Sequence, residues 1–182
     1  MKNTGIIRKV DDLGRIVIPK EIRNVLFIKE GTPMEISVSD EASIVLRKNN
    51  AIENIGDIAE KYCNVLYEIL DNPIFISDDR KILYCVGASK KTYQNKELSN
   101  ELIKMISNSI NYTASDEYKT TLLPIIKGGE VDCISQIIIP IILEGNSIGL
   151  IILLSNKNTL GSSDVKIVQA VSKLISMQLS NT

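Results

Sequence analysis

A change of composition after residue 48 divides this chain of 182 residues into two unequal parts, and the smaller part restricts what the chain can fold into. Residues 49–56, Asn-Asn-Ala-Ile-Glu-Asn-Ile-Gly, have the composition of a linker. We therefore predict a first domain over residues 1–50, a linker over 51–56 and a second domain over 57–182. A unit of about 50 residues is near the size at which one chain cannot bury enough surface to offset its conformational entropy without disulfides, a metal or oligomerisation.

Histidine is absent, and the three cysteines, Cys63, Cys85 and Cys133, form no C-x-x-C pair. This excludes the usual base at neutral pH and the commonest metal ligand, and it argues against a disulfide framework or a zinc site. We expect buried thiols in a reducing cytoplasm, no metal and no cofactor. Oligomerisation is then the remaining way to stabilise the small first unit, which we predict to be an obligate dimer.

The N-terminus has no apolar run long enough for a signal peptide, so a cytoplasmic protein is expected. The most apolar stretch, residues 137–154, is divided by Glu144-Gly145-Asn146-Ser147. Two apolar runs around a turn predict a buried β-hairpin and not a membrane span. No membrane partner is expected.

In the first unit the pattern predicts two β-hairpins around a short helix. Residues 5–10 and 15–18 form the first hairpin around the turn 11–14, Pro19 opens a helix over 19–27, and residues 33–38 and 43–48 form the second hairpin.

In the second part, the periodicity predicts helices over residues 57–70, 97–110 and 165–179, the last capped by residues 161–164. The first helix carries an apolar stripe of Ile58, Tyr62, Val65, Leu66 and Ile69, and on the last we expect Val168, Val171, Leu174 and Ile175 to face inward. Strands are predicted over 73–77, 82–86, 120–127, 131–142 and 147–154. Consecutive hairpins bracketed by helices indicate an α+β fold with an antiparallel sheet.

Motifs for catalysis are missing. Residues 145–149, Gly-Asn-Ser-Ile-Gly, match the G-x-S-x-G pattern of hydrolases, but without histidine and before a strand we interpret them as a hairpin turn. Neither glycine-rich phosphate motif occurs. With no clustered acid-base groups, the sequence predicts that the protein is not an enzyme.

Charge is distributed unevenly: residues 1–29 hold seven Lys or Arg and three Asp or Glu, whereas the remainder is net acidic. Such a basic segment suggests that the partner is a nucleic acid. The alternative is that these basic residues only form an ordinary solvent-exposed face. Phe27 is the only aromatic residue there, so there is no stacking platform for single strands. Double-stranded DNA is the better target.

Residues 4–23, Thr-Gly-Ile-Ile-Arg-Lys-Val-Asp-Asp-Leu-Gly-Arg-Ile-Val-Ile-Pro-Lys-Glu-Ile-Arg, resemble the opening of AbrB-like transition-state regulators. The resemblance covers residues 1–50, and the rest resembles the GAF-like domain of a sporulation regulator of this kind. It implies an all-β swapped-hairpin barrel, formed by two chains, that binds duplex DNA. Carried over by position, it implies DNA contacts by Arg8, Lys9, Arg15, Arg23 and Asn24, where Asn24 supplies no charge at a position at which relatives often have arginine.

The second resemblance implies an α+β GAF-like domain that joins two dimers into a tetramer through helical contacts over residues 57–70 and the last helix. The expected function is sequence-selective transcriptional regulation of sporulation genes. Two alternatives stay open. The GAF-like domain could bind an unknown small molecule that gates DNA binding, or the chain could be an antitoxin, although antitoxins usually follow this fold with a short tail.

Overall fold

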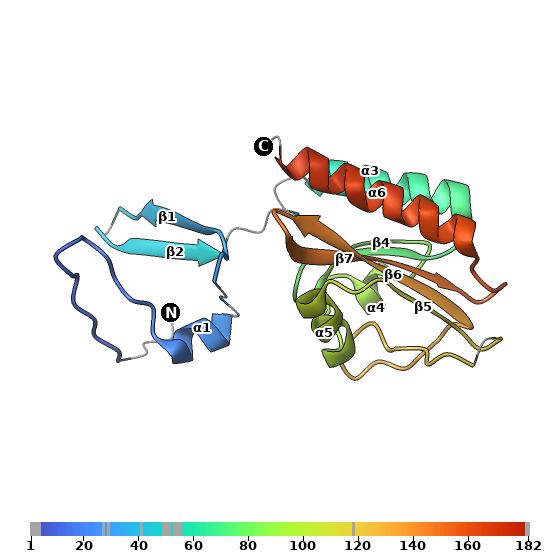
Figure 1. Ribbon diagram of the computed structural model, residues 1–182, viewed down its shortest axis with the longest axis horizontal. Coiled ribbons are helices and arrows are strands. Elements are labelled where there is room, and N and C mark those ends of the chain that lie inside the picture. Colours follow the sequence, from blue (N-terminus) through green and yellow to red (C-terminus); the bar gives the residue numbers. More distant parts are fainter. Residues whose placement is uncertain are drawn as a thin grey trace. The chain divides into compact units, whose positions relative to one another are not determined.

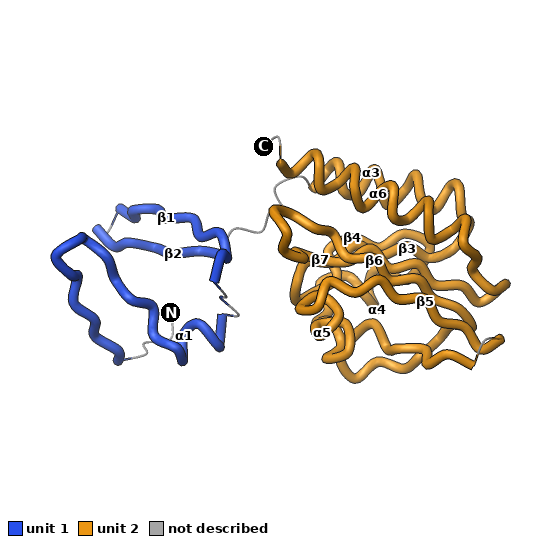
Figure 2. The backbone as a smooth tube through the Cα atoms, viewed as in Figure 1, with its two compact units in different colours: residues 1–49 blue, residues 50–182 orange. Residues whose placement is uncertain are grey.

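A computed structural model of the chain describes residues 5–26, 28, 30–40, 42–48, 52, 56–117 and 119–180. These form two compact units, residues 1–49 and 50–182, which Figure 2 shows in different colours. Lys2, Phe27, Lys29 and most of the expected linker lie outside the described residues. Ile52 is described and is buried in the core of the second unit.

In the first unit, helix α1 spans Lys20–Leu26, and strands β1 (Met34–Val38) and β2 (Ile44–Lys48) pair antiparallel. The helix and this hairpin agree with the sequence prediction. The predicted hairpin over residues 5–18 is wrong for the single chain: its turn is present, since the Gly14 N–H donates to the Asp11 carbonyl at 3.0 Å, but neither arm is a strand. The arms carry β-branched residues that find no strand partner within one chain.

The second unit contains a five-stranded antiparallel sheet in the order β4-β3-β7-β6-β5. Its strands are β3 (Ile74–Ser77), β4 (Ile82–Val86), β5 (Tyr112–Ser115), β6 (Ser135–Leu143) and β7 (Asn146–Ser155), and its helices are α3 (Gly56–Leu70), α4 (Lys90–Tyr93), α5 (Asn100–Asn108) and α6 (Ser162–Ser180). Helices α3 and α6 cover one face, and α4 and α5 lie on the other (Figure 1).

Both faces of this sheet are buried, which explains the long apolar runs of β6 and β7. Ile137, Ile139 and Ile151 pack toward α3 and α6, whereas Ile138 and Ile152 pack toward α5. The two strands meet at a two-residue loop, Glu144 (φ +49°) and Gly145 (φ +81°), with Leu143 paired to Asn146. Positive φ at both loop positions is the requirement of a tight hairpin turn, so the interpretation of the G-x-S-x-G pattern is confirmed.

The predicted strand over residues 120–127 is wrong. Pro124 has no N–H to donate, and only Ile126 forms an isolated bridge, with Leu98. The buried Gln136 takes the place of a strand partner: its Oε1 accepts from the Leu123 N–H at 2.6 Å and its Nε2 donates to the Leu123 carbonyl at 3.1 Å. The short elements α4 and β5 were not predicted.

The apolar stripe of the first helix is buried only in part, and the inward-facing stripe predicted for the last helix needs one correction. On α3 the fully buried side chains are Ala59, Cys63 and Leu66, whereas Val65 and Ile69 are exposed. On α6, Val168, Val171 and Ile175 are buried as predicted, but Leu174 is exposed. Each helix therefore has a second apolar edge on its outer surface.

One edge of the sheet is only partly covered. Strand β5 pairs with β6 from Ser135 to Ile138, and Pro140 lies beyond that pairing. The Ser172 hydroxyl of α6 donates to the Pro140 carbonyl at 2.7 Å. The last helix thus satisfies a backbone acceptor of β6 that β5 does not reach.

Candidate nucleic-acid interface

The turn at residues 11–14 positions the first candidate DNA-contacting residues. Asp11 is at its first position and Gly14, with φ +75°, at its last, as is common in four-residue turns. The Asp11 Oδ1 accepts from the N–H groups of Leu13 at 3.0 Å and Arg15 at 2.8 Å. One carboxylate therefore orders the turn and fixes where Arg15 leaves it.

The same carboxylate holds the Arg15 side chain. Arg15 Nε donates to Asp11 Oδ2 at 2.8 Å, and the Arg15 side chain remains 67% exposed. Hydrogen bonds from the Arg15 N–H, and then from its guanidinium, lower the pKa of Asp11 below its ordinary value. A guanidinium has five N–H donors, so the donors on its Nη atoms are left for a phosphate or a guanine edge.

Arg8 and Lys9 lie on the arm before the turn, and both are exposed. Arg8 donates from Nη1 to the adjacent Ile7 carbonyl at 3.1 Å. In the described part of the chain neither residue forms an ion pair with an acidic side chain. Their charges are available to an anionic partner.

Arg23 differs from the other two arginines. It is half-buried on α1, and its Nη1 donates to the Ile18 carbonyl at 2.6 Å, which joins the helix to the arm that follows the turn. Part of its donor set therefore stabilises the unit itself. Asn24, next on the helix, is exposed.

Sequence reasoning identified these cations but missed the role of Asp11 in holding Arg15, because the local composition around Asp11 indicates only a turn. Two signals could have revealed that role: an aspartate three residues before glycine, and an acid four residues before an arginine.

The thiols match the expectation of buried cysteines only in part, since Cys63 and Cys85 are buried and Cys133 is half-buried. Burial raises the pKa of Cys63 to about 12, with the neighbouring Cys85 adding to the effect. Burial, followed by the charges of Asp116 and Asp132, raises the pKa of Cys133 to about 11. These thiols are protonated at neutral pH and are poor nucleophiles.

A second candidate site lies in unit 2, where a cleft of about 510 Å³ opens at the end of the sheet. Its wall includes Asp71 and Asn72, which follow α3, and Lys157, which follows β7. Sequence reasoning missed these residues, because no local spacing brings positions 71 and 157 together. None of the described helices is long and apolar enough to cross a membrane.

Two known families match the chain, and their matches meet within a few residues of the boundary between the two units. The family described as "Stage V sporulation protein T C-terminal, transcription factor" matches residues 54–180. The family described as "Antidote-toxin recognition MazE, bacterial antitoxin" matches residues 7–53.

Individual curated relatives agree with these two family matches. The chain is 36% identical to stage V sporulation protein T of Bacillus subtilis (strain 168), over 98% of this chain and 99% of that protein. It is 37% identical to the transition state regulatory protein AbrB of the same organism, over 56% of this chain and 94% of that protein. The resemblance of the first unit to AbrB-like regulators is thereby confirmed.

Solved structures confirm the fold of the second unit. The GAF domain of an Acinetobacter phosphoenolpyruvate-protein phosphotransferase superposes with a TM-score of 0.56 at 10% identity, covering 72% of this chain and 89% of that one. A type II free methionine-R-sulfoxide reductase from Thermoplasma acidophilum has the same TM-score at 14% identity, covering 72% and 96%. At such identities the likeness concerns the fold, which is AbrB-like in unit 1 and GAF-like in unit 2. The protein thus belongs to the stage V sporulation protein T family of transcription factors.

Proposed function

We propose that this protein is a sequence-selective regulator of sporulation genes that binds double-stranded DNA as a tetramer through Arg8, Lys9, Arg15, Arg23 and Asn24. The observation that carries the proposal is the Asp11-ordered turn, which fixes the exposed Arg15 in a unit of AbrB-like fold. Phosphate contacts by Arg8 and Lys9 would fix the position of the protein on the duplex, and Arg15 would contact base edges in a groove. Since the chromosome is its target, we place the protein in the cytoplasm.

A dimer through unit 1 is the first part of the proposed assembly. Among its described residues only Pro19 is fully buried. Ile36, Val38 and Ile44 share one apolar face of the β1–β2 hairpin, and each is about two-thirds exposed or more, at 69%, 76% and 67%. An unpaired unit with such a face would not bury enough surface to be stable.

A groove of about 310 Å³ in the same unit supports the dimer. Its lining is mostly apolar, with Ile6 and Ile16 from the arms, Leu26 from α1 and Leu46 from β2. The two arms that lack a strand partner in one chain would supply strands to a second copy. This arrangement would form the swapped-hairpin barrel and place two turns on one surface.

A tetramer through unit 2 is the second part. The outer surface of α3 exposes Val65 (46%) and Ile69 (61%), and that of α6 exposes Leu174 (46%) and Met177 (63%). The two helices lie side by side on one face of the sheet (Figure 1). Exposed apolar side chains on paired helices are typical of helix-to-helix association between subunits.

Joining two DNA-binding dimers raises the affinity by avidity, provided that both reach the duplex together. A tetramer would therefore bind paired sites more tightly than a dimer binds one site.

The test is the salt dependence of binding to a duplex promoter fragment, comparing the wild type with the triple variant Arg8→Ala, Arg15→Ala and Arg23→Ala. We expect the slope of log K against log salt to fall by about 0.9 for each DNA phosphate that the variant no longer neutralises. A control triple variant, Lys91→Ala, Lys96→Ala and Lys104→Ala, removes the same charge from exposed positions of unit 2. Equal slopes for both triple variants would refute the assignment of DNA contacts to unit 1.

The alternative of a small-molecule sensor is favoured by one observation, the cleft beside Asn72, and we propose it as a second function of unit 2 that works through the tetramer. The antitoxin alternative has less support, because the antitoxin family matches only residues 7–53, whereas stage V sporulation protein T matches nearly the whole chain.

A further inference from the structure

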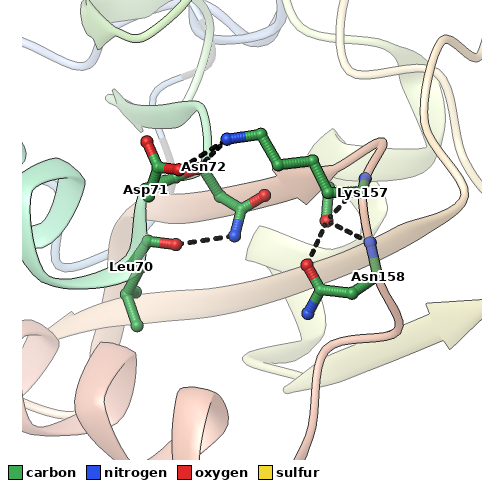
Figure 3. Close-up of polar contacts among 6 residues, drawn as sticks. Leu70, Asp71, Asn72, Lys157 and Asn158 are labelled. Carbon is green, nitrogen blue, oxygen red and sulfur yellow. Dashed lines mark hydrogen bonds and ion pairs between the residues drawn. The ribbon is translucent and has the colours of Figure 1, made fainter.

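Two residues that line the cleft at the end of the sheet, Lys157 and Asp71, form an ion pair, which we call the latch. Lys157 Nζ donates to Asp71 Oδ2 at 2.6 Å and to the Asp71 carbonyl at 3.1 Å. Figure 3 shows Lys157 reaching Asp71 beside the Asn72 amide. Both latch side chains are largely exposed, so the pair adds little stability and opens easily.

Next to the latch lies a buried amide whose oxygen has no hydrogen-bond partner. Asn72 is 5% exposed, and its Nδ2 donates to the Leu70 carbonyl at 2.7 Å, which fixes the orientation of the amide. Its Oδ1 has no hydrogen-bond partner. Because buried acceptors are nearly always paired and Asn72 lines the cleft, a donor bound in the cleft would satisfy this oxygen.

The charge of the cleft favours a cationic donor. Its lining includes two carboxylates, Asp71 and Asp132, against one ammonium, Lys157. The latch neutralises Lys157 and Asp71 together, and in the described part of the chain Asp132 forms no ion pair. Asp132 is exposed and lines the cleft, so a cation bound beside it would meet an uncompensated negative charge.

The remaining walls fit an organic ion better than a metal. Tyr67, Phe75 and Tyr93 line the cleft with Leu154, and the rings of Phe75 and Tyr93 pack edge to face with centroids 5.0 Å apart. Aromatic rings attract ammonium groups, and they also bury an alkyl chain. Burial raises the pKa of the Tyr93 hydroxyl, and the negative charge of Asp132 raises it further. This carboxylate therefore lies near the aromatic wall.

We propose that this cleft binds a small alkylammonium ligand whose N–H groups donate to Asn72 Oδ1 and whose charge pairs with Asp132. The ligand would reach Asn72 Oδ1 once the latch opens, and its alkyl chain would lie against Phe75 and Tyr93. The proposal names the ligand class of the sensor function above and rests on that function for its role in regulation. It does not depend on DNA binding by unit 1.

The latch also explains how binding could reach the tetramer. Asp71 directly follows α3, and Lys157 lies in the segment that leads into α6. A ligand that separates Lys157 from Asp71 would release one connection between the ends of the two helices that we propose for subunit association. Ligand binding and tetramer geometry would then be linked.

Isothermal titration of the full chain with butylammonium tests the proposal, with butyrate as a probe of the same size and opposite charge. We expect saturable binding of butylammonium only, weakened by about tenfold or more in Asp132→Asn because the charge pair is removed. Glu130→Gln is the matched control. It removes the same charge two positions before Asp132, and the Glu130 side chain does not line the cleft, so this variant should bind as the wild type does.

A second variant, Asn72→Leu, removes the unpaired oxygen with a side chain of similar shape and should lose binding. It also removes the bond to the Leu70 carbonyl, so thermal unfolding is measured alongside to show that the variant folds. Absence of saturable binding at about 10 mM ligand would overturn the proposal and leave a bridging water as the partner of Asn72 Oδ1. Equal affinity of Asp132→Asn and Glu130→Gln, or binding of butyrate, would overturn it as well. DNA affinity measured without ligand tests the function of unit 1 separately.

Discussion

The Asp11 carboxylate accepts two hydrogen bonds from Arg15, one from its backbone N–H and one from its Nε, each at 2.8 Å. This pairing restricts the guanidinium before any DNA arrives, so less conformational entropy is lost on binding. It also places a negative charge beside the proposed DNA contact, which opposes non-specific attraction to phosphates.

Asp11→Asn separates these two effects. An amide oxygen can still accept from the turn N–H groups, but the charged partner of Nε is gone. We expect tighter binding to random duplex DNA and a several-fold smaller ratio of specific to non-specific affinity, measured by competition. Asp12→Asn removes the same charge one residue later, where the side chain has no hydrogen bond to Arg15, and should leave that ratio unchanged. If both variants keep the wild-type ratio, Asp11 does not orient Arg15.

Arg23→Ala should lower stability as well as DNA affinity, because Arg23 Nη1 donates to the half-buried Ile18 carbonyl at 2.6 Å. Losing a hydrogen bond from a charged donor costs about 1–3 kcal/mol. Urea denaturation of unit 1 measures this loss. Arg8→Ala, whose donor reaches only a neighbouring exposed carbonyl, should weaken DNA binding with no comparable shift of the midpoint.

Met177→Glu places a charge on the exposed apolar surface of α6 and should convert the proposed tetramer into dimers. Light scattering after size-exclusion chromatography gives the mass. Gln178→Glu changes the charge equally at an adjacent exposed position and serves as the control. A tetramer that survives Met177→Glu, and equally Ile69→Glu, would exclude these surfaces as the interface.

Gly149→Ala should destabilise unit 2 strongly, since a Cβ there would clash with the Ser77 carbonyl oxygen of the neighbouring strand. Overpacking against backbone costs about 1–3 kcal/mol or more. Gly128→Ala is a useful comparison because nothing lies within 4 Å of its Cβ, although its φ of +69° adds some strain. Thermal unfolding that ranks Gly128→Ala as the more damaging substitution would contradict this packing.

Cys63 makes stability depend on pH in the alkaline range. Its folded pKa is raised to about 12, so the unfolded state loses this proton first as pH rises. The stabilising effect is complete below the ordinary thiol pKa of 9.0 and is lost as pH rises toward 12. Urea midpoints between about pH 9 and pH 11 should therefore fall less steeply in Cys63→Ala than in the wild type, whereas parallel curves would show that burial of this thiol does not shift its titration.

Much of the fold followed from the sequence, because hydrophobic periodicity and turn residues act locally. The β6–β7 hairpin, α1 and the β1–β2 hairpin were predicted within a few residues. The strand predicted over 120–127 failed for a reason that lies elsewhere in the chain: the partner of Leu123 is the Gln136 side chain, and no local pattern reveals this.

The sequence indicated which cationic residues belong to the candidate site, but it did not indicate how they are arranged. Arg8 and Arg15 could be found from charge and resemblance, whereas the bond from Arg23 to the Ile18 carbonyl depends on how α1 folds back on the preceding arm. The latch was beyond sequence reasoning, since Asp71 and Lys157 are 86 positions apart. Leu174 was wrongly predicted to face inward, because helical periodicity does not tell which apolar side chains of a stripe face the core.

Pro140 has a consequence for solubility at high concentration. The Leu150 N–H is directed to the Ser77 hydroxyl on β3, so in the antiparallel pair of Pro140 and Leu150 the proline backbone faces the open edge of β6. That edge has no N–H at this position, and its carbonyl is taken by Ser172. A strand from another molecule would find neither a donor nor an acceptor there, so the uncovered half of β6 is protected against the edge-to-edge growth that leads to aggregates.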